Sequence, residues 1–447
     1  MTTAWRDRLI EAGALLLLVF SPLAFGVVEP WSEAIVELVI LGMAVVYVIG
    51  TLHHWEFRVE LAPGSLPALL FLGLVALQTV LPGWSVDPHV TREEGLKLTA
   101  VAVFFLICYN TYRSRAQAQR ALWTMLVTGT LISVLGVVQR VTWNHRLYWI
   151  GPEIEYGAPF GPFVNRTHFA GLIVVIVPMT VALFMGRRRS GRRLRRRRRT
   201  WRDRLREWNS TGTDATRLIP FLILVMGGAA LVSGSRGGAV ALLAAFLAMI
   251  TGSLARGRSW SGWAARLALG TALIVLAGVW IGGDIVYGTV ERLAEELGRP
   301  EESPRLLIWA DALKLWRAAP VLGTGFATFG VAFPRFRTLE APVVFSHAES
   351  DWIQLLTDTG VVGLTLALAT IASLGLALLS RYLHTESRWA RTLALAGLVA
   401  LGGTVVQGIA NYNLPVMSNF IYLALAVALA ATATDASGAA RASTVPT

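Results

Sequence analysis

Long apolar runs separated by short polar or arginine-bearing segments dominate the chain. Each run is close to the ~20 residues that a helix needs to cross the hydrocarbon core of a bilayer. The pattern predicts an all-α polytopic integral membrane protein with about twelve transmembrane helices, at roughly 9–28, 32–51, 64–82, 94–111, 119–139, 166–186, 218–234, 237–254, 266–283, 352–379, 392–410 and 415–433. The first run resembles a signal peptide but lacks a small-x-small cleavage site, so we interpret it as a retained span.

Composition agrees with this class, since 54% of the 447 residues are hydrophobic and the mean hydropathy is +0.56. The single cysteine, Cys108, lies inside an apolar run, which excludes an internal disulfide and a cysteine-based metal site. The formal net charge of +12 is carried by arginine, because only Lys97 and Lys314 are lysines.

The placement of these arginines predicts the orientation. They concentrate in alternate inter-span segments, at 112–118, 187–217, 255–265 and 380–391. The positive-inside rule places these segments and both termini in the cytoplasm. A polyarginine run within 187–217 is a possible nucleic-acid signal, but a single loop between spans is more simply a topology anchor at anionic lipid headgroups. We therefore expect membrane lipids, and no nucleic acid, as partners.

The longest outer segment under this topology is the loop 284–351. Ser303-Pro304 is typical of a helix start, with Pro at the first helical position. Apolar side chains then recur at three- and four-residue spacing, at Leu306, Trp309, Leu313 and Trp316, and the helix is expected to end at Ala319-Pro320. This pattern predicts an amphipathic helix at the membrane interface.

Ser346 to Leu364 carries the most prominent candidate chemistry. Ser346 and Glu349 have the spacing of a capping box, which predicts a helix whose first residue is His347. Asp351, four residues on, would lie beside the imidazole. The helix terminus disfavours imidazolium and a carboxylate favours it, so His347 is a candidate base. The alternative is an interfacial histidine that only caps or snorkels.

Three other outer features are candidates. The turn SGSRGG, residues 233–238, could present Ser235, backbone N–H groups and Arg236 to an anion, or Arg236 could snorkel to a lipid phosphate. Arg305 is either functional or an exposed surface charge. Asn165 and His168 could bind a sugar or phosphate, although a helix cap is the favoured interpretation. Charged side chains in or near a membrane cost free energy, so several of them on one face favour a functional role for these residues.

Metal chemistry is not indicated by the sequence. H-E-x-x-H and D-x-D motifs are absent, and the outer carboxylates are not spaced as a cluster: Asp284, Glu301, Glu302, Glu349 and Asp351. We therefore expect no metal and no cofactor.

The ordered set of these motifs resembles the O-antigen ligase and polymerase superfamily. SGSRGG, the Arg305–Trp309 segment leading to Pro320, Gly323 and Gly325, and the segment from His347 to Leu364 all match its pattern. FGPFVNRTHFAG, residues 160–171, looks like another of its segments, with Thr167 in place of the usual second Asn. After His347 the family usually has Asn, where this chain has Ala348, so Asp351 is nominated as the partner of His347 from helical spacing alone.

The resemblance implies a GT-C-like membrane glycosyltransferase that takes a glycan from undecaprenyl diphosphate. It implies that Arg236 and Arg305 bind the diphosphate and that His347 acts on the acceptor hydroxyl, as general base or positioning group. The expected parts are N-terminal transmembrane helices at 1–154, a ligase-like core at 155–410 with one long periplasmic loop at 284–351, and the last helix and tail at 411–447. The protein would reside in the bacterial inner membrane, with its site on the periplasmic side.

The acceptor distinguishes the competing hypotheses. A ligase transfers to lipid A-core in lipopolysaccharide biosynthesis and is favoured, because the long loop is undivided and bears both Arg305 and His347. The alternatives are an O-antigen or exopolysaccharide polymerase, with a second lipid-linked glycan as acceptor, and a protein O-oligosaccharyltransferase. A small-anion transporter shares the twelve-span plan, but transporters bind at the bilayer midplane, whereas the charged residues here lie on one face.

Overall fold

A computed structural model describes residues 4–52, 59–150, 153, 159–186, 218–254, 304–338 and 345–434. Within these ranges the regular structure is helical. The helices are α1 (Ala4–Leu23), α2 (Pro30–Leu52), α3 (Ser65–Val80), α4 (Pro88–Thr111), α5 (Arg115–Val141), α6 (Arg166–Met185), α8 (Ile219–Val232), α9 (Arg236–Leu254), α12 (Pro304–Ala318), α13 (Phe329–Ala332), α14 (Asp351–His384), α15 (Arg388–Gln407) and α16 (Met417–Thr432), with short 3₁₀ turns at Leu147–Trp149 and Phe333–Arg335.

The protein is a multi-pass membrane protein. Among the described helices, six are long and apolar enough to span a membrane, namely α2, α4, α5, α6, α14 and α15. Four shorter apolar helices accompany them, namely α3, α8, α9 and α16. Each predicted span falls on a helix except 266–283, which lies outside the described residues, as does the polyarginine run.

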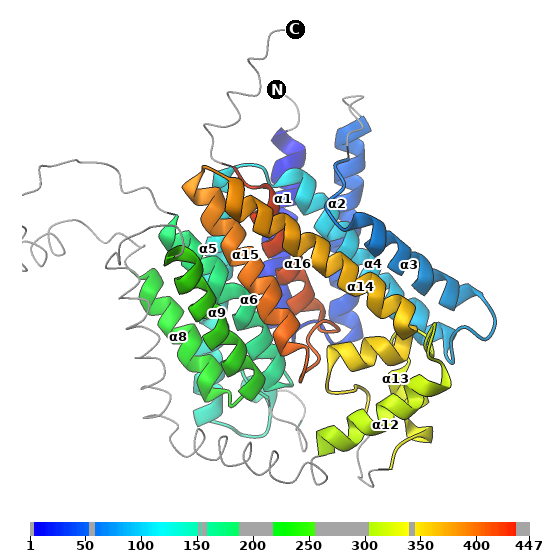
Figure 1. The fold of residues 1–447 in the computed structure, drawn as a ribbon. Helices are drawn as coiled ribbons and strands as arrows, with labels where there is room; N and C mark the ends of the chain where they lie inside the picture. The colour runs from blue at the N-terminus through cyan, green and yellow to red at the C-terminus, as the bar shows by residue number, and fades with distance from the viewer. Residues whose placement is uncertain are drawn as a thin grey trace, which may run out of the picture.

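Helix α6 forms the centre of the bundle, packed against α5, α8, α9, α15 and α16 (Figure 1). Its side chains are apolar all round, as expected of a helix enclosed by others. Almost all of its residues are buried, whereas most of the apolar surface of α14 remains uncovered by protein. An uncovered apolar helix surface is what a bilayer accommodates.

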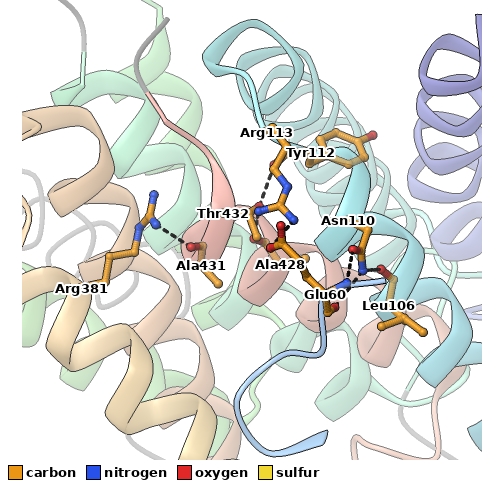
Figure 2. Close-up of polar contacts among 9 residues, drawn as sticks. All are labelled: Glu60, Leu106, Asn110, Tyr112, Arg113, Arg381, Ala428, Ala431 and Thr432. Carbon is orange, nitrogen blue, oxygen red and sulfur yellow. Dashed lines mark hydrogen bonds and ion pairs between the residues drawn. The ribbon is translucent and has the colours of Figure 1, made fainter. Parts of the chain in front are cut away.

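The end of the bundle near the start of α1 is closed by polar contacts, which Figure 2 shows. The Arg381 guanidinium donates to the carbonyl oxygens of Ala431 and Ala433, both at 2.6 Å. Thr432 donates to the Tyr112 carbonyl at 2.6 Å. Arg381 therefore satisfies carbonyl groups at the end of α16, and Thr432 satisfies one at the end of α4, which the helices themselves would leave unpaired.

The predicted amphipathic helix is confirmed as α12, which begins at Pro304 and ends at Ala318. Its protein-facing side is made by Ile308, Ala312 and Leu315, which pack in a small separate core with α13 residues. Leu306, in contrast, is exposed. The other apolar side chains of the predicted pattern, Trp309, Leu313 and Trp316, are partly buried.

The segment after α12 is joined tightly to α14 at a break in that helix. Gly360 has φ 64° and ψ −168°, which interrupts the helical geometry. Across the break, Thr324 N–H donates to the Thr357 carbonyl and Gly325 N–H to the Asp358 carbonyl, both at 3.0 Å. This clamp fixes α12 against the start of α14 (Figure 1).

Candidate functional site

The polar residues singled out in the sequence lie at one end of the bundle. The starts of α6, α9, α14 and α16 meet there, around the loop 408–416 (Figure 1). Asp351 N–H donates to the carbonyls of Gly408 at 2.9 Å and Asn411 at 3.0 Å. A Cβ on Gly237 would lie 2.3 Å from Asn411 Nδ2. The loop 408–416 therefore touches both α14 and α9.

His347 lies just before α14. Its Nδ1 is 3.1 Å from Gln354 Oε1, and its ring stacks on Tyr412 with centroids 4.2 Å and planes 21° apart. Burial lowers the pKa of His347 from 6.5, and the hydrogen bond with Gln354 opposes this shift. A lowered pKa leaves the imidazole neutral at neutral pH, the form that can accept a proton.

The predicted capping box at Ser346 is wrong. The helix α14 begins at Asp351, and its N-cap is Ser350, whose Oγ accepts from Ile353 N–H at 3.4 Å. Glu349 has φ 55°, a left-handed conformation that ends any helix upstream of it. The loop 408–416 binds the backbone of Asp351, the first residue of α14. This contact, and not the Ser346–Glu349 spacing, sets where the helix starts.

The predicted pairing of Asp351 with His347 is wrong for the same reason. The Asp351 carboxylate accepts from the backbone N–H groups of Asn413 at 3.1 Å and Leu414 at 3.3 Å. It therefore orders the loop that carries Tyr412. Gln354 is the side chain that hydrogen-bonds the imidazole.

Tyr412 connects the FGPFVNRTHFAG segment to His347. The ring of His168 meets Tyr412 edge-on, with centroids 4.9 Å apart. The Asn165 side chain hydrogen-bonds Tyr412 as well, and it caps α6 by accepting from Thr167 N–H at 2.9 Å. The favoured interpretation of Asn165 as a helix cap is confirmed. His168 is buried, and its Nε2 has no hydrogen-bond partner among the described contacts.

Arg305 reaches the same end from the first turn of α12. Its Nη2 lies 4.0 Å from Glu349 Oε2, with both side chains partly exposed. Burial raises the pKa of Glu349, and the Arg305 charge lowers it. The Trp309 indole donates to the Ala348 carbonyl at 3.0 Å, which holds α12 next to His347. A guanidinium, a carboxylate and an imidazole thus lie in the same part of the structure.

The SGSRGG turn leads into α9, whose first residue is Arg236. Ser235 is buried, and its Oγ accepts from Gly238 N–H at 3.3 Å, as a helix-capping serine does. A Cβ on Gly238 would lie 2.3 Å from that of Ala170. The small residues of this turn therefore allow α9 to pack closely on α6, with Arg236 at the site end of the bundle.

No group of three or more His, Cys, Asp or Glu residues suited to a metal ion occurs within the described ranges. The predicted outer carboxylates Asp284, Glu301 and Glu302 lie outside these ranges. Arg305, Arg236 and Glu349 are charged residues in the described part of the site.

Comparison with protein families gives one match, in which residues 221–368 fit the family model described as O-antigen ligase. These residues are similar to the domain that this family model describes. Members of this family transfer lipid-linked glycans. The matched residues include Arg236, Arg305 and His347, and the match ends within α14. No curated protein sequence matches the chain.

Three residues of the site were missed by sequence reasoning: Glu349, Gln354 and Tyr412. Gln354 was visible as a polar residue in the apolar run of α14, seven residues after His347. Tyr412 was visible only as one of several polar residues between two apolar runs. Its contact with His347 spans 65 positions of the chain, so no local pattern could reveal it.

Proposed function

We propose that the protein is an O-antigen ligase-type glycosyltransferase that moves a glycan from undecaprenyl diphosphate to lipid A-core. The observation that carries this proposal is the meeting of His347, Tyr412 and the Arg305–Glu349 pair at one end of a membrane bundle. A guanidinium can hold a diphosphate, and a neutral imidazole can take a hydroxyl proton. The family match supports the same reaction class.

In the proposed topology, twelve spans of a GT-C-like bundle place this end in the periplasm and both termini in the cytoplasm. The arginine-rich segment 187–217 joins α6 to α8. Gly186, which follows α6, accepts a 2.6 Å hydrogen bond from Arg115 at the start of α5, the end opposite the site. The positive-inside rule then supports a cytoplasmic position for that end.

In the proposed mechanism, the acceptor hydroxyl attacks the anomeric carbon of the donor sugar. The new C–O bond forms as the bond to the diphosphate breaks, and the electron pair leaves with the diphosphate. Arg305 and Arg236 stabilise the charge that develops there. His347 takes the hydroxyl proton. A single displacement inverts the anomeric configuration.

We retain the expected division of the chain into 1–154, 155–410 and 411–447, with 155–410 as the ligase-like core and the loop 284–351 as its periplasmic roof. Tyr412 stacks on His347, so the last segment would complete the site of that core. A transporter site would be expected near the middle of the bundle. The cluster around His347 lies instead at the helix ends, which favours the transferase.

Complementation tests this proposal in strains that lack either the ligase or the polymerase, with lipopolysaccharide gels as the measurement. We expect the wild type to restore laddered O-antigen on lipid A-core in the ligase-null strain. His347→Ala should lose this activity. His384→Ala is the matched control, because His384 lies at the opposite end of α14, bonded to the Ser380 carbonyl at 2.8 Å. Rescue only in the polymerase-null strain would reassign the function, and full activity of His347→Ala would refute the mechanism.

A further inference from the structure

The imidazole of His347 is held by two residues, Gln354 and Tyr412. Gln354 Oε1 lies 3.1 Å from Nδ1, and Tyr412 stacks on the ring at 4.2 Å. One contact is directional and fixes an individual nitrogen, while the other fixes the plane of the ring. Together they leave Nε2 as the nitrogen without an assigned partner in the described contacts.

The identity of the Gln354 atom that faces His347 follows from a second contact. The backbone N–H of Ala348 donates to the same Oε1 at 3.4 Å. A backbone N–H can only donate, so the atom that it meets is the amide oxygen and not the amide nitrogen. An oxygen can only accept, and therefore Nδ1 of His347 must carry the hydrogen. In a neutral imidazole the lone pair is then on Nε2.

The Gln354 amide is itself held in place. Gln354 is buried, and its side chain interacts with that of Asp358, one helical turn further along α14. Asp358 is anchored in turn, since its Oδ2 accepts from Ala327 N–H at 3.1 Å. This contact favours the orientation in which the amide nitrogen faces Asp358 and the amide oxygen faces His347.

We propose that Gln354 is a positioning residue that fixes His347 in the Nδ1–H tautomer, so that Nε2 receives the proton of the acceptor hydroxyl. This inference rests on the proposed function and specifies its base. The hydroxyl O–H bond breaks, its proton binds the Nε2 lone pair, the oxygen bonds to the anomeric carbon, and the diphosphate leaves with its electron pair. Nδ1–H keeps its bond to Gln354 throughout, so no rearrangement accompanies the transfer. The other tautomer carries hydrogen on Nε2 and could not accept the proton.

Ring-¹⁵N histidine labelling of the full-length protein in lipid nanodiscs tests the tautomer directly. The chain has seven histidines, and the His347 signals are those that disappear in His347→Gln. We expect the wild type to show a protonated Nδ1 and a bare Nε2. Gln354→Met removes the acceptor at similar length and should transfer the proton to Nε2. Gln407→Met is the matched control, because Gln407 is another buried glutamine but donates to the Thr167 carbonyl at 3.2 Å.

Gln354→Glu provides a second variant, since it keeps an accepting oxygen and adds negative charge. We expect His347 to stay in the Nδ1–H tautomer and to take up its second proton at a higher pH than in the wild type. The other titratable groups, namely His168, Tyr412, Glu349 and Arg305 around the imidazole and Asp358 beside residue 354, are the same in both proteins. A wild-type Nε2–H tautomer, or no change in either Gln354 variant, would overturn the inference.

Transfer activity separates this inference from the proposed function. In the complementing strain, Gln354→Met should lose on the order of 10²-fold of its transfer rate, the contribution of a correctly placed general base. Gln354→Glu should retain activity, and the acid limb of its pH–rate profile should lie at higher pH than in the wild type. Transfer that is indifferent to a demonstrated change of tautomer would refute the role of Nε2 but leave the glycosyltransferase intact. An Nδ1–H tautomer set by Gln354, with no transfer in any strain, would instead refute the proposed function.

Discussion

Gly360 is the position at which a single methyl group should have the largest effect on this fold. A Cβ there would lie 2.2 Å from the carbonyl oxygen of Val321 and 2.6 Å from Leu322 N. The approach is reciprocal, because a Cβ on Gly323 would lie 2.3 Å from the carbonyl carbon of Asp358. Both glycines have positive φ, at 64° and 72°. The clamp between α14 and the segment after α12 therefore requires glycine on both sides.

The magnitude for Gly360→Ala follows from two contributions. A residue with a Cβ in this conformation costs about 1–3 kcal/mol. The overlap with Val321 also forces the two segments apart, which weakens the bonds from Val361 N–H to the Pro320 carbonyl and from Val362 N–H to the Val321 carbonyl. Each such bond contributes about 1 kcal/mol. We expect a loss of about 3–5 kcal/mol in the free energy of unfolding.

Titration of the purified protein with SDS in mixed micelles, followed by tryptophan fluorescence, measures this quantity. Gly375→Ala is the matched control on the same helix, because its Cβ would meet only Leu398 and Leu401 at 4.0 Å. Alanine is the better helix former by about 1 kcal/mol, so the control should be neutral or slightly stabilised. Equal stability of the two variants would refute the clamp. The double variant of Gly323→Ala and Gly360→Ala should lose less free energy of unfolding than the sum of the two single losses, because both substitutions disrupt the same contact.

Four further predictions follow from the site and the opposite end. Arg305→Ala should lower the transfer rate by on the order of 10²-fold and Arg305→Lys by less, because lysine keeps the charge without the bidentate geometry; rates in isolated membranes would show this. The rate should be constant through neutral pH and fall only below 6.5, because burial lowers the pKa of His347 and its neutral form is active; an acid limb centred above 6.5 would contradict this. Tyr412→Phe should retain activity and Tyr412→Ala lose it, measured by complementation, because stacking rather than the hydroxyl orients His347. Arg381→Ala should cost about 2 kcal/mol in SDS titration but leave the rate per folded molecule unchanged, since its bonds to carbonyls such as that of Ala431 lie far from the site.

The helices were predictable because burial of the backbone in lipid requires helices of a certain length. Apolar runs of that length therefore identify spans without knowledge of their neighbours. The amphipathic helix α12 was predictable for a local reason as well, since Ser303-Pro304 and Ala319-Pro320 mark its ends. The candidate residues His347, Arg305 and Arg236 were found because ionisable groups are rare in such a chain.

The start of α14 was not predictable from the S-x-x-E spacing. Ser346 and Glu349 satisfy the local pattern of a capping box, but the loop 408–416 binds Asp351 more than fifty positions away in the sequence. The spacing of Ser346 and Glu349 describes only the hydrogen bonds that residues near a helix start could make with one another. Such spacing cannot show a hydrogen-bond partner that is distant in the sequence. Here the loop 408–416 is that partner, and its bonds to Asp351 set the start of α14.

The sequence by itself determined the class of the protein, the helical runs and the identity of the charged groups, because each depends on transfer of nearby residues between water and lipid. The tertiary structure alone decided which groups meet. It joined His347 to Gln354 and Tyr412, assigned Asp351 to the loop 408–416, and brought Glu349 to Arg305. These contacts depend on how α6, α12, α14 and α16 pack at one end of the bundle, and helix packing is set by the shapes of side chains distant in sequence.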